Sequence, residues 1–287
     1  AEIPRVPSPT NILQIHVKTA SPEGTLEGLT RIFQRISDKL AGKCGVNAST
    51  GELLGFLDDD NWPDPTWVSE AISFAQIHPQ AGAFGSRITG KFEVPPPATW
   101  KPILGYLAIV ERGNTPQPYQ PRKNGTPPNA GLVVHRKAWI QAIPNNPFLV
   151  GRVGTSMLPG EDSEILIYLY RAGWEIWHNP VMKIEHYIPS SRLQSAYLRE
   201  ILLGVGLCRY HLRMLILPRW QRPIMTLIYI LSDVLKLVHY FLKHHQYLKN
   251  DVVANCQWAL LWGTLISPFF LLKVRLERSR ILVSQLD

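Results

Sequence analysis

The chain has little cysteine and lacks several common functional signatures. Only three of its 287 residues are cysteine, at the widely separated positions 44, 208 and 256. Their spacing excludes a disulfide framework and a zinc ribbon, and favours incidental thiols in a reducing compartment. No secretory signal peptide is visible. No Gly-rich GxxxxGK[ST] loop occurs, which counts against the alternative of a phosphoryl-transfer enzyme.

Acidic residues are scarce in the last third of the chain. Residues 1–191 contain 17 Lys or Arg and 17 Asp or Glu, whereas residues 192–287 contain 13 and 5. The whole net charge of +8 therefore belongs to the C-terminal third. A basic, apolar and aromatic-rich segment favours an anionic membrane surface over a nucleic acid. The alternative is a soluble helical bundle with Lys and Arg on its outer side.

What is present is a 45% share of hydrophobic residues, enough for one large core and too high for a disordered chain. Short apolar runs bounded by turn residues predict strands, and apolar residues three and four apart predict helices. The strands are expected at 12–17, 52–57, 81–88, 131–135, 175–178 and 181–188. The helices are expected within 27–48, after Asp64-Pro65, at 136–142 and from Gly160 to about Ala172. The stretch 89–128 is expected to be mostly loop.

Beyond Arg192 the pattern changes to long helices. Residues 252–272 include no charged side chain and are long enough to span a bilayer, although polar residues and Pro268 weaken that prediction. Residues 223–242 are interrupted by Asp233, Lys236 and His239, which is typical of an interfacial amphipathic helix. The alternative is a buried hairpin of soluble helices.

The first candidate site is Asp58-Asp59-Asp60, at the end of the predicted strand 52–57. Open α/β sheets bind ligands at the carboxyl ends of their strands. Asp58 and Asp60 are two residues apart, so a turn can direct both toward one hard divalent cation. The alternative is an acidic turn that caps the next helix.

Four further residues are weaker candidates. Glu161 and Asp162 begin a predicted helix, where a carboxylate stays ionised and can act as a general base, although ordinary capping is the better explanation for an isolated Glu-Asp pair. His186 lies on a predicted strand and is either a metal or phosphate ligand or an ordinary strand histidine. Gly131 permits close approach of the backbone to a ligand.

Taken together, four stretches resemble family 2 glycosyltransferases of the GT-A fold. They are TGELLGFLDDDN (50–61), NAGLVVHRKAW (129–139), PGEDSEILIYLYRAGWEIWHNP (159–180) and KIEHYIP (183–189). A second set of stretches, within residues 51–273, is similar to cyanobacterial hormogonium polysaccharide glycosyltransferases. These stretches are DDDNWPDPTWV, HPQAGAFGS, FEVPPP, LAIVERG, PYQPRK, WQRP and LISPFFLLK.

The resemblance implies an α/β GT-A domain at 1–191, followed by a helical, membrane-associated region at 192–287. It implies an inverting enzyme that moves a sugar from a nucleotide-sugar donor to a saccharide or lipid-linked acceptor at the cytoplasmic face of the inner membrane. It implies Mg²⁺ or Mn²⁺ as cofactor.

The resemblance also assigns roles to residues. Asp60, Asp58 and His186 match metal-site positions, and Asp58, Asp59 and Gly131 match the donor side. Asp162 matches the catalytic base, with Glu161 beside it.

The sequence departs from the family on the donor side. About 60 residues that normally form the nucleotide-binding front end are expected to be missing or replaced by residues 1–11. The position where the family carries arginine holds Gly42 or Lys43. These departures keep open the alternative of an inactive remnant that serves as a scaffold in a polysaccharide-synthesis complex.

Overall fold

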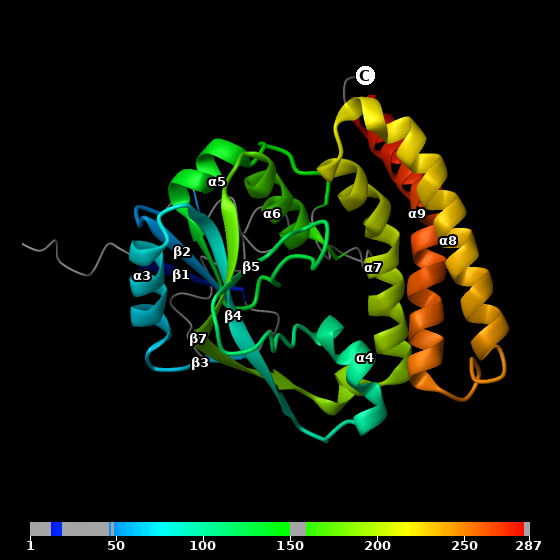
Figure 1. The fold of residues 1–287 in the computed structure, drawn as a ribbon, viewed down its shortest axis with the longest axis horizontal. Helices are drawn as coiled ribbons and strands as arrows, with labels where there is room; N and C mark the ends of the chain where they lie inside the picture. Colours follow the sequence, from blue (N-terminus) through cyan, green and yellow to red (C-terminus); the bar gives the residue numbers. More distant parts are fainter. Residues whose placement is uncertain (1–12, 19–45, 47–48, 150–158, 284–287) are drawn as a thin grey trace, which may run out of the picture. The chain divides into compact units, whose positions relative to one another are not determined.

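The computed structural model of the chain describes residues 13–18, 46, 49–149 and 159–283. Apart from residue 46, the predicted helix within 27–48 lies outside the described residues, and so does the departure at Gly42 and Lys43. The chain divides into two compact units (Figure 1). The sheet unit contains Ala1–Lys91, Ile109–Asn145 and Tyr168–Tyr187, and the helical unit contains Phe92–Ala108, Asn146–Ile167 and Ile188–Asp287.

The described strands form one seven-stranded sheet in the order β1-β2-β6-β4-β7-β3, with β5 paired to β7. Their bounds are β1 Leu13–Lys18, β2 Leu53–Asp58, β3 Asn61–Pro63, β4 Ala81–Phe92, β5 Gln117–Pro118, β6 Leu132–His135 and β7 Glu175–Ile188. β1 runs parallel to β2, and β6 runs antiparallel to β2 and to β4. Because β2 lies between two strands, its residues from Leu53 to Leu57 are buried.

Two helices of the sheet unit cover the apolar side chains of the strands. In α3 (Trp67–Ile77), Phe74 packs against Phe84 of β4, with ring centroids 5.0 Å apart. In α5 (Arg136–Ala142), Trp139 stacks on Phe56 of β2 at 5.9 Å. The bounds of α5 agree with the helix predicted from the sequence.

The prediction of two short strands at 175–178 and 181–188 was wrong, because β7 is continuous through Pro180. Proline lacks an N–H donor and normally interrupts a strand that is paired on both sides. On one edge of β7, β5 pairs with Trp177 and His178, and β3 pairs with residues 184–186. Pro180 falls between these two partners, so its missing N–H removes no bond on that edge.

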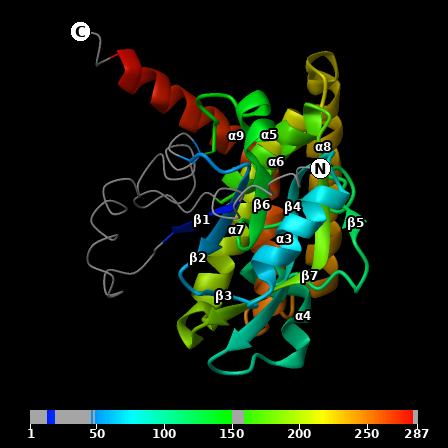
Figure 2. The same ribbon diagram turned by 90° about the vertical axis from the view of Figure 1, so that its left-hand side faces the viewer.

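The helical unit is dominated by three long helices, α7 (Ser195–Ile216), α8 (Arg222–His244) and α9 (Val252–Val283), together with short α4 (Lys101–Leu104). α9 lies between α7 and α8 (Figures 1 and 2). Glycines allow α7 and α9 to approach closely, since a Cβ on Gly206 would lie 2.5 Å from the Leu260 carbonyl oxygen. A Cβ on Gly263 would likewise lie 2.6 Å from the carbonyl oxygen of Leu203.

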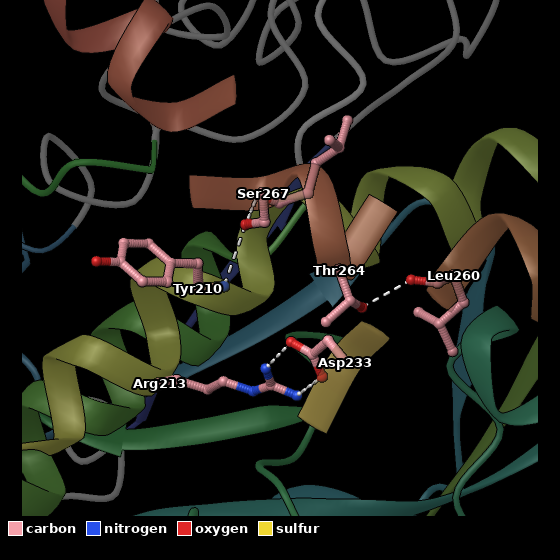
Figure 3. Close-up of polar contacts among 7 residues, drawn as sticks. Tyr210, Arg213, Asp233, Leu260, Thr264 and Ser267 are labelled. Carbon is pink, nitrogen blue, oxygen red and sulfur yellow. Dashed lines mark hydrogen bonds and ion pairs between the residues drawn. The ribbon is translucent and has the colours of Figure 1, made fainter. Parts of the chain in front are cut away.

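The polar residues within the apolar sequence of α9 have partners inside the helical unit. The Ser267 hydroxyl donates to the Leu207 carbonyl at 2.5 Å and accepts from the Tyr210 N–H at 3.2 Å (Figure 3). The Thr264 hydroxyl donates to the Leu260 carbonyl at 2.7 Å. These bonds explain why a mostly apolar helix carries hydroxyl groups: they are buried where a packed helix satisfies them.

Two helices are long and apolar enough to cross a membrane, over Arg219–His244 and Val252–Glu277. In the most apolar 18-residue window of the first helix, only 11% is buried. In the corresponding window of the second helix, 28% is buried. A core helix of a soluble protein would be mostly buried. The predicted architecture, an α/β sheet followed by apolar C-terminal helices, is confirmed.

Candidate active site

The acidic turn begins where β2 emerges from the buried centre of the sheet. Asp58 and Asp60 are half-buried, Asp59 is exposed and Asn61 is buried. The Asp58 N–H donates to Asn61 Oδ1 at 3.1 Å, and Asn61 Nδ2 donates to Asp60 Oδ1 at 3.0 Å. Asn61 therefore closes the turn and fixes the orientation of the Asp60 carboxylate.

The acidic turn does not cap the following helix, which disfavours that alternative. The turn before α3 is stabilised by Asp64. Its carboxylate accepts hydrogen bonds from the Thr66 N–H at 3.0 Å and from the Thr66 hydroxyl at 2.8 Å. Local side-chain bonds of this kind stabilise the turn before a helix. The three preceding aspartates are therefore not needed for capping.

β7 brings His186 to the acidic turn. The register of β3 on β7 places Asn61 opposite His186, and the Tyr187 N–H donates to the Asp60 carbonyl at 2.9 Å. His186 Nε2 lies 3.4 Å from Asp60 Oδ2. The His186 side chain is nearly buried and that of Asp60 is partly buried. Two of the three predicted metal-site residues are thus brought together by strand pairing.

The Asp60–His186 pair brings one carboxylate oxygen and one imidazole nitrogen together, two ligand types that divalent cations bind. Two ligand atoms at right angles on one ion, each about 2.1 Å from it, are about 3 Å apart. At 3.4 Å, the separation of Oδ2 and Nε2 is longer than that value, and it is also that of an ordinary carboxylate–histidine pair. Among the described residues, no group of three or more His, Cys, Asp and Glu side chains is arranged to hold a metal ion. An ion here would need further oxygen ligands, which Mg²⁺ commonly takes from substrate phosphates and water.

Gly131 lies directly before β6 with a φ of +67°, in the left-handed region. A Cβ at this position would lie 2.1 Å from Ile184 Cδ1 and 2.7 Å from Ser86 Oγ. The Ser86 hydroxyl donates to the Gly131 carbonyl at 2.6 Å and accepts from Trp67 Nε1 at 2.8 Å. The close approach predicted at Gly131 is therefore made by protein atoms that tie β6, β4 and α3 together.

A second polar cluster of the sheet unit was not predicted from the sequence. His178 is fully buried, and neither of its ring nitrogens has a hydrogen-bond partner among the residues that the structure describes. Burial lowers the pKa of His178 to about 4, and the positive charges of Arg112 and Arg87 add to the effect. Arg112 lies over the ring of Tyr119 at 4.2 Å. These residues stand on separate segments, so no local pattern could group them.

In the helical unit, Glu161 and Asp162 form the first turn of α6 (Glu161–Arg171) and are both half-buried. Gly160 precedes them with a φ of +113°, a backbone conformation that favours glycine. The Glu164 N–H donates to the Gly160 carbonyl at 2.9 Å, which begins the helix. Both predicted catalytic carboxylates thus lie at the N-terminal end of the helix.

Glu164 is a buried residue of the same turn that sequence reasoning missed. Its carboxylate accepts the N–H groups of Phe148 at 2.9 Å and Leu149 at 2.5 Å. His211 Nε2 of α7 lies 3.0 Å from the same carboxylate. Glu164 therefore joins the start of α6, the segment 148–149 and the middle of α7.

Comparison with known families gives a direct match for the acidic turn. Residues 41–133 match the model described as "Glycosyl transferase family 2". This segment includes β2, the three aspartates, α3, β4 and the start of β6. Residues 1–60 match a second model, described as "Hypothetical glycoside hydrolase 5", so the two matches share residues 41–60.

Among curated proteins, none matches the chain in sequence. Solved structures that are similar include that of GalNAc-T7 with UDP, GalNAc and Mn²⁺, at 12% identity and a TM-score of 0.39 over 69% of this chain and 41% of that one. Another is Staphylococcus aureus TarS 1–349, at 13% identity and a TM-score of 0.36 over 68% of this chain and 56% of that one. TarS 1–349 in complex with UDP-GlcNAc also matches, at 12% identity and a TM-score of 0.38 over 67% and 56%. The chain spans about half the length of these structures.

Proposed function

We propose that the protein is an inverting glycosyltransferase. It would move a sugar from a nucleotide-sugar donor to a saccharide or lipid-linked acceptor during polysaccharide synthesis, as in the hormogonium polysaccharide enzymes it resembles. The observation that carries the proposal is the Asp60–His186 pair, placed by β2 and β7 at the end of a buried strand. Asp60 also lies inside the segment that matches family 2 glycosyltransferases.

In this proposal, Asp60 and His186 hold Mg²⁺ or Mn²⁺, with Asp58 and Asp59 on the donor side and Gly131 beside it. A bound divalent cation neutralises the diphosphate leaving group. Asp162, with Glu161 beside it, removes the proton from the acceptor hydroxyl, whose oxygen attacks the anomeric carbon as the bond to the nucleoside diphosphate breaks. The result is inversion at that carbon and release of the nucleoside diphosphate.

The proposed place of action is the cytoplasmic face of the inner membrane. Exposed apolar side chains on α8 and α9 support it, as does the excess of basic residues from Arg192 onward. The proposed domain boundary lies where this basic excess begins. It separates a GT-A domain at 1–191 from a helical membrane-associated region at 192–287. An enzyme bound to that membrane surface would have direct access to a lipid-linked acceptor in the same membrane.

The test is calorimetry with a panel of UDP-, GDP- and TDP-sugars, with and without Mn²⁺, on the wild type and the Asp60→Asn variant. We expect Mn²⁺-dependent binding of one nucleotide class, weakened at least about tenfold by Asp60→Asn, since disturbing a metal shell costs that much or more. The matched control is Glu185→Gln, which neutralises an exposed carboxylate next to His186. That variant should bind the donor like the wild type.

Absence of donor binding by folded protein would replace the enzyme proposal with the scaffold alternative. A glycosidase, the class named by the match over residues 1–60, would instead release free sugar from a glycoside without any nucleotide donor. Assaying both reactions on one preparation separates these outcomes.

A further inference from the structure

One side of α8 is apolar and exposed along nearly its whole length. Its nine members are 37–71% exposed, although each carries a large hydrophobic side chain. They recur at spacings of three and four residues, which places them on one side of the helix. We call this set the α8 apolar face: Ile224, Leu227, Ile228, Leu231, Val234, Leu235, Val238, Phe241 and Leu242.

The opposite side of α8 is fixed to its neighbours by polar contacts. Arg213 of α7 donates to both oxygens of the buried Asp233 carboxylate, at 2.6 and 3.2 Å (Figure 3). The Tyr240 hydroxyl lies 3.2 Å from the Ala254 carbonyl of α9. Removing one member of such a pair leaves a buried charge uncompensated, which is costly. These contacts set the rotation of α8 and keep its apolar face outward.

The exposed charged residues between positions 219 and 250 are all basic. Between residues 219 and 250 the basic residues are Arg219, Arg222, Lys236, Lys243 and Lys249, whereas the sole acidic residue is Asp233. Asp233 is buried and paired with Arg213, so it does not offset the exposed basic groups. A second copy of this face would bring like charges together. An anionic lipid surface offers both an apolar layer and the opposite charge.

α8 is long enough to span a bilayer, but its middle argues for another orientation. Lys236 and His239 are exposed near the centre of the helix. In a spanning helix they would lie near the bilayer midplane, where charged groups are unfavourable. In a helix lying flat, the long side chain of Lys236 extends from the polar side of the helix to the level of the headgroups. The exposed ends of α8 carry further basic residues that would do the same.

We propose that α8 lies in the plane of the membrane surface, with its apolar face among the acyl chains and its basic residues among anionic headgroups. The partner is therefore a bilayer that contains anionic lipid. The inference specifies how the membrane location proposed above is achieved, and it rests on that part of the proposed function. Donor binding belongs to the sheet unit, so the two can be tested separately.

The experiment is sedimentation of the purified full chain with vesicles of phosphatidylcholine alone or mixed with phosphatidylglycerol. We expect binding at least about tenfold stronger to the anionic vesicles and weakened by salt, as for other basic interfacial helices. Leu231→Glu, in the centre of the face, should weaken binding at least about tenfold. Ile77→Glu is the matched control, since Ile77 is an equally exposed apolar residue on α3. Ile77→Glu should bind vesicles like the wild type.

Each remaining outcome decides against the proposal. Resistance of the bound chain to alkaline carbonate extraction would show that the chain spans the bilayer and does not merely lie on its surface. Failure to sediment with anionic vesicles would exclude lipid as the partner, and dimers abolished by Leu231→Glu would identify a second copy instead.

Thermal unfolding of both variants checks folding, and Mn²⁺-dependent donor binding by Leu231→Glu shows whether a failure concerns the membrane surface or the glycosyltransferase proposal.

Discussion

At the scale of single residues, Gly131 offers the sharpest test of the sheet unit. Replacement by alanine adds a Cβ that would lie 2.1 Å from Ile184 Cδ1, at a φ of +67°. We expect Gly131→Ala to lower the free energy of unfolding by about 2–4 kcal/mol, through overpacking together with backbone strain. Urea unfolding followed by circular dichroism measures the loss.

The matched control separates crowding from strain. Gly173 also has a positive φ, of +90°, but a Cβ there would meet nothing within 4 Å. Gly173→Ala should therefore cost only about 1 kcal/mol, from backbone strain alone. Equal losses in the two variants would show that contact with Ile184 is not what requires glycine at position 131.

Single residues also mark the limit of prediction from the sequence. The three aspartates and His186 were predicted because each stands on or directly after an apolar run. The role of Asn61 in closing the turn was not, because an asparagine after three aspartates carries no signal of its own. His178, Arg87 and Arg112 are brought near one another only by the fold. Burial of a polar group by segments far apart in sequence leaves no local pattern.

At the scale of elements, Glu164 joins α6 to α7 and to the segment 148–149. Burial raises the pKa of Glu164, but hydrogen bonds and charge from His211, with the N–H groups of Leu149 and Phe148, outweigh it and the net pKa is lowered. A carboxyl with a lowered pKa stabilises the folded state above its unfolded pKa of 4.5 and loses that contribution as pH falls through the folded value.

We therefore expect Glu164→Gln to lower the free energy of unfolding at pH 7 by about 2 kcal/mol or more. The variant should also lose less stability than the wild type between pH 5 and about pH 3. Urea unfolding across that range measures both effects. Glu200→Gln, at an exposed position on α7, should follow the wild type at every pH. Parallel pH profiles for Glu164→Gln and wild type would contradict the assigned role.

Most elements could be predicted because their burial follows a simple period. α5 and the start of α9 lie where the sequence places them, and β2 agrees to within one residue. β7 was predicted as two strands because the pairing of β5 and β3 around Pro180 depends on distant segments. The glycines at the crossing of α7 and α9 were not predicted either. A glycine in a helix has no side chain to show which way it faces.

At the scale of the whole molecule, the two compact units interleave along the sequence. Residues 92–108 and 146–167 belong to the same unit as the C-terminal helices. Composition changes at residue 192, where the basic excess begins, so composition alone suggests a boundary there. Contacts between segments distant in sequence are not visible in composition. The predicted domain boundary at residue 191 stays a prediction.

The proposed reaction uses Asp60 and Asp162, which belong to different units. Because a base acts on the acceptor and not on the donor diphosphate, Asp162→Asn should bind the donor within about threefold of wild type while its rate falls about 10²- to 10⁴-fold. Asp60→Asn should lose both donor affinity and reaction rate. Calorimetry gives donor affinity, and release of nucleoside diphosphate from the same preparation gives the rate. Glu200→Gln serves as an exposed carboxylate control and should retain both. If Asp162→Asn loses donor affinity as severely as Asp60→Asn, Asp162 belongs to donor binding and another residue must accept the proton.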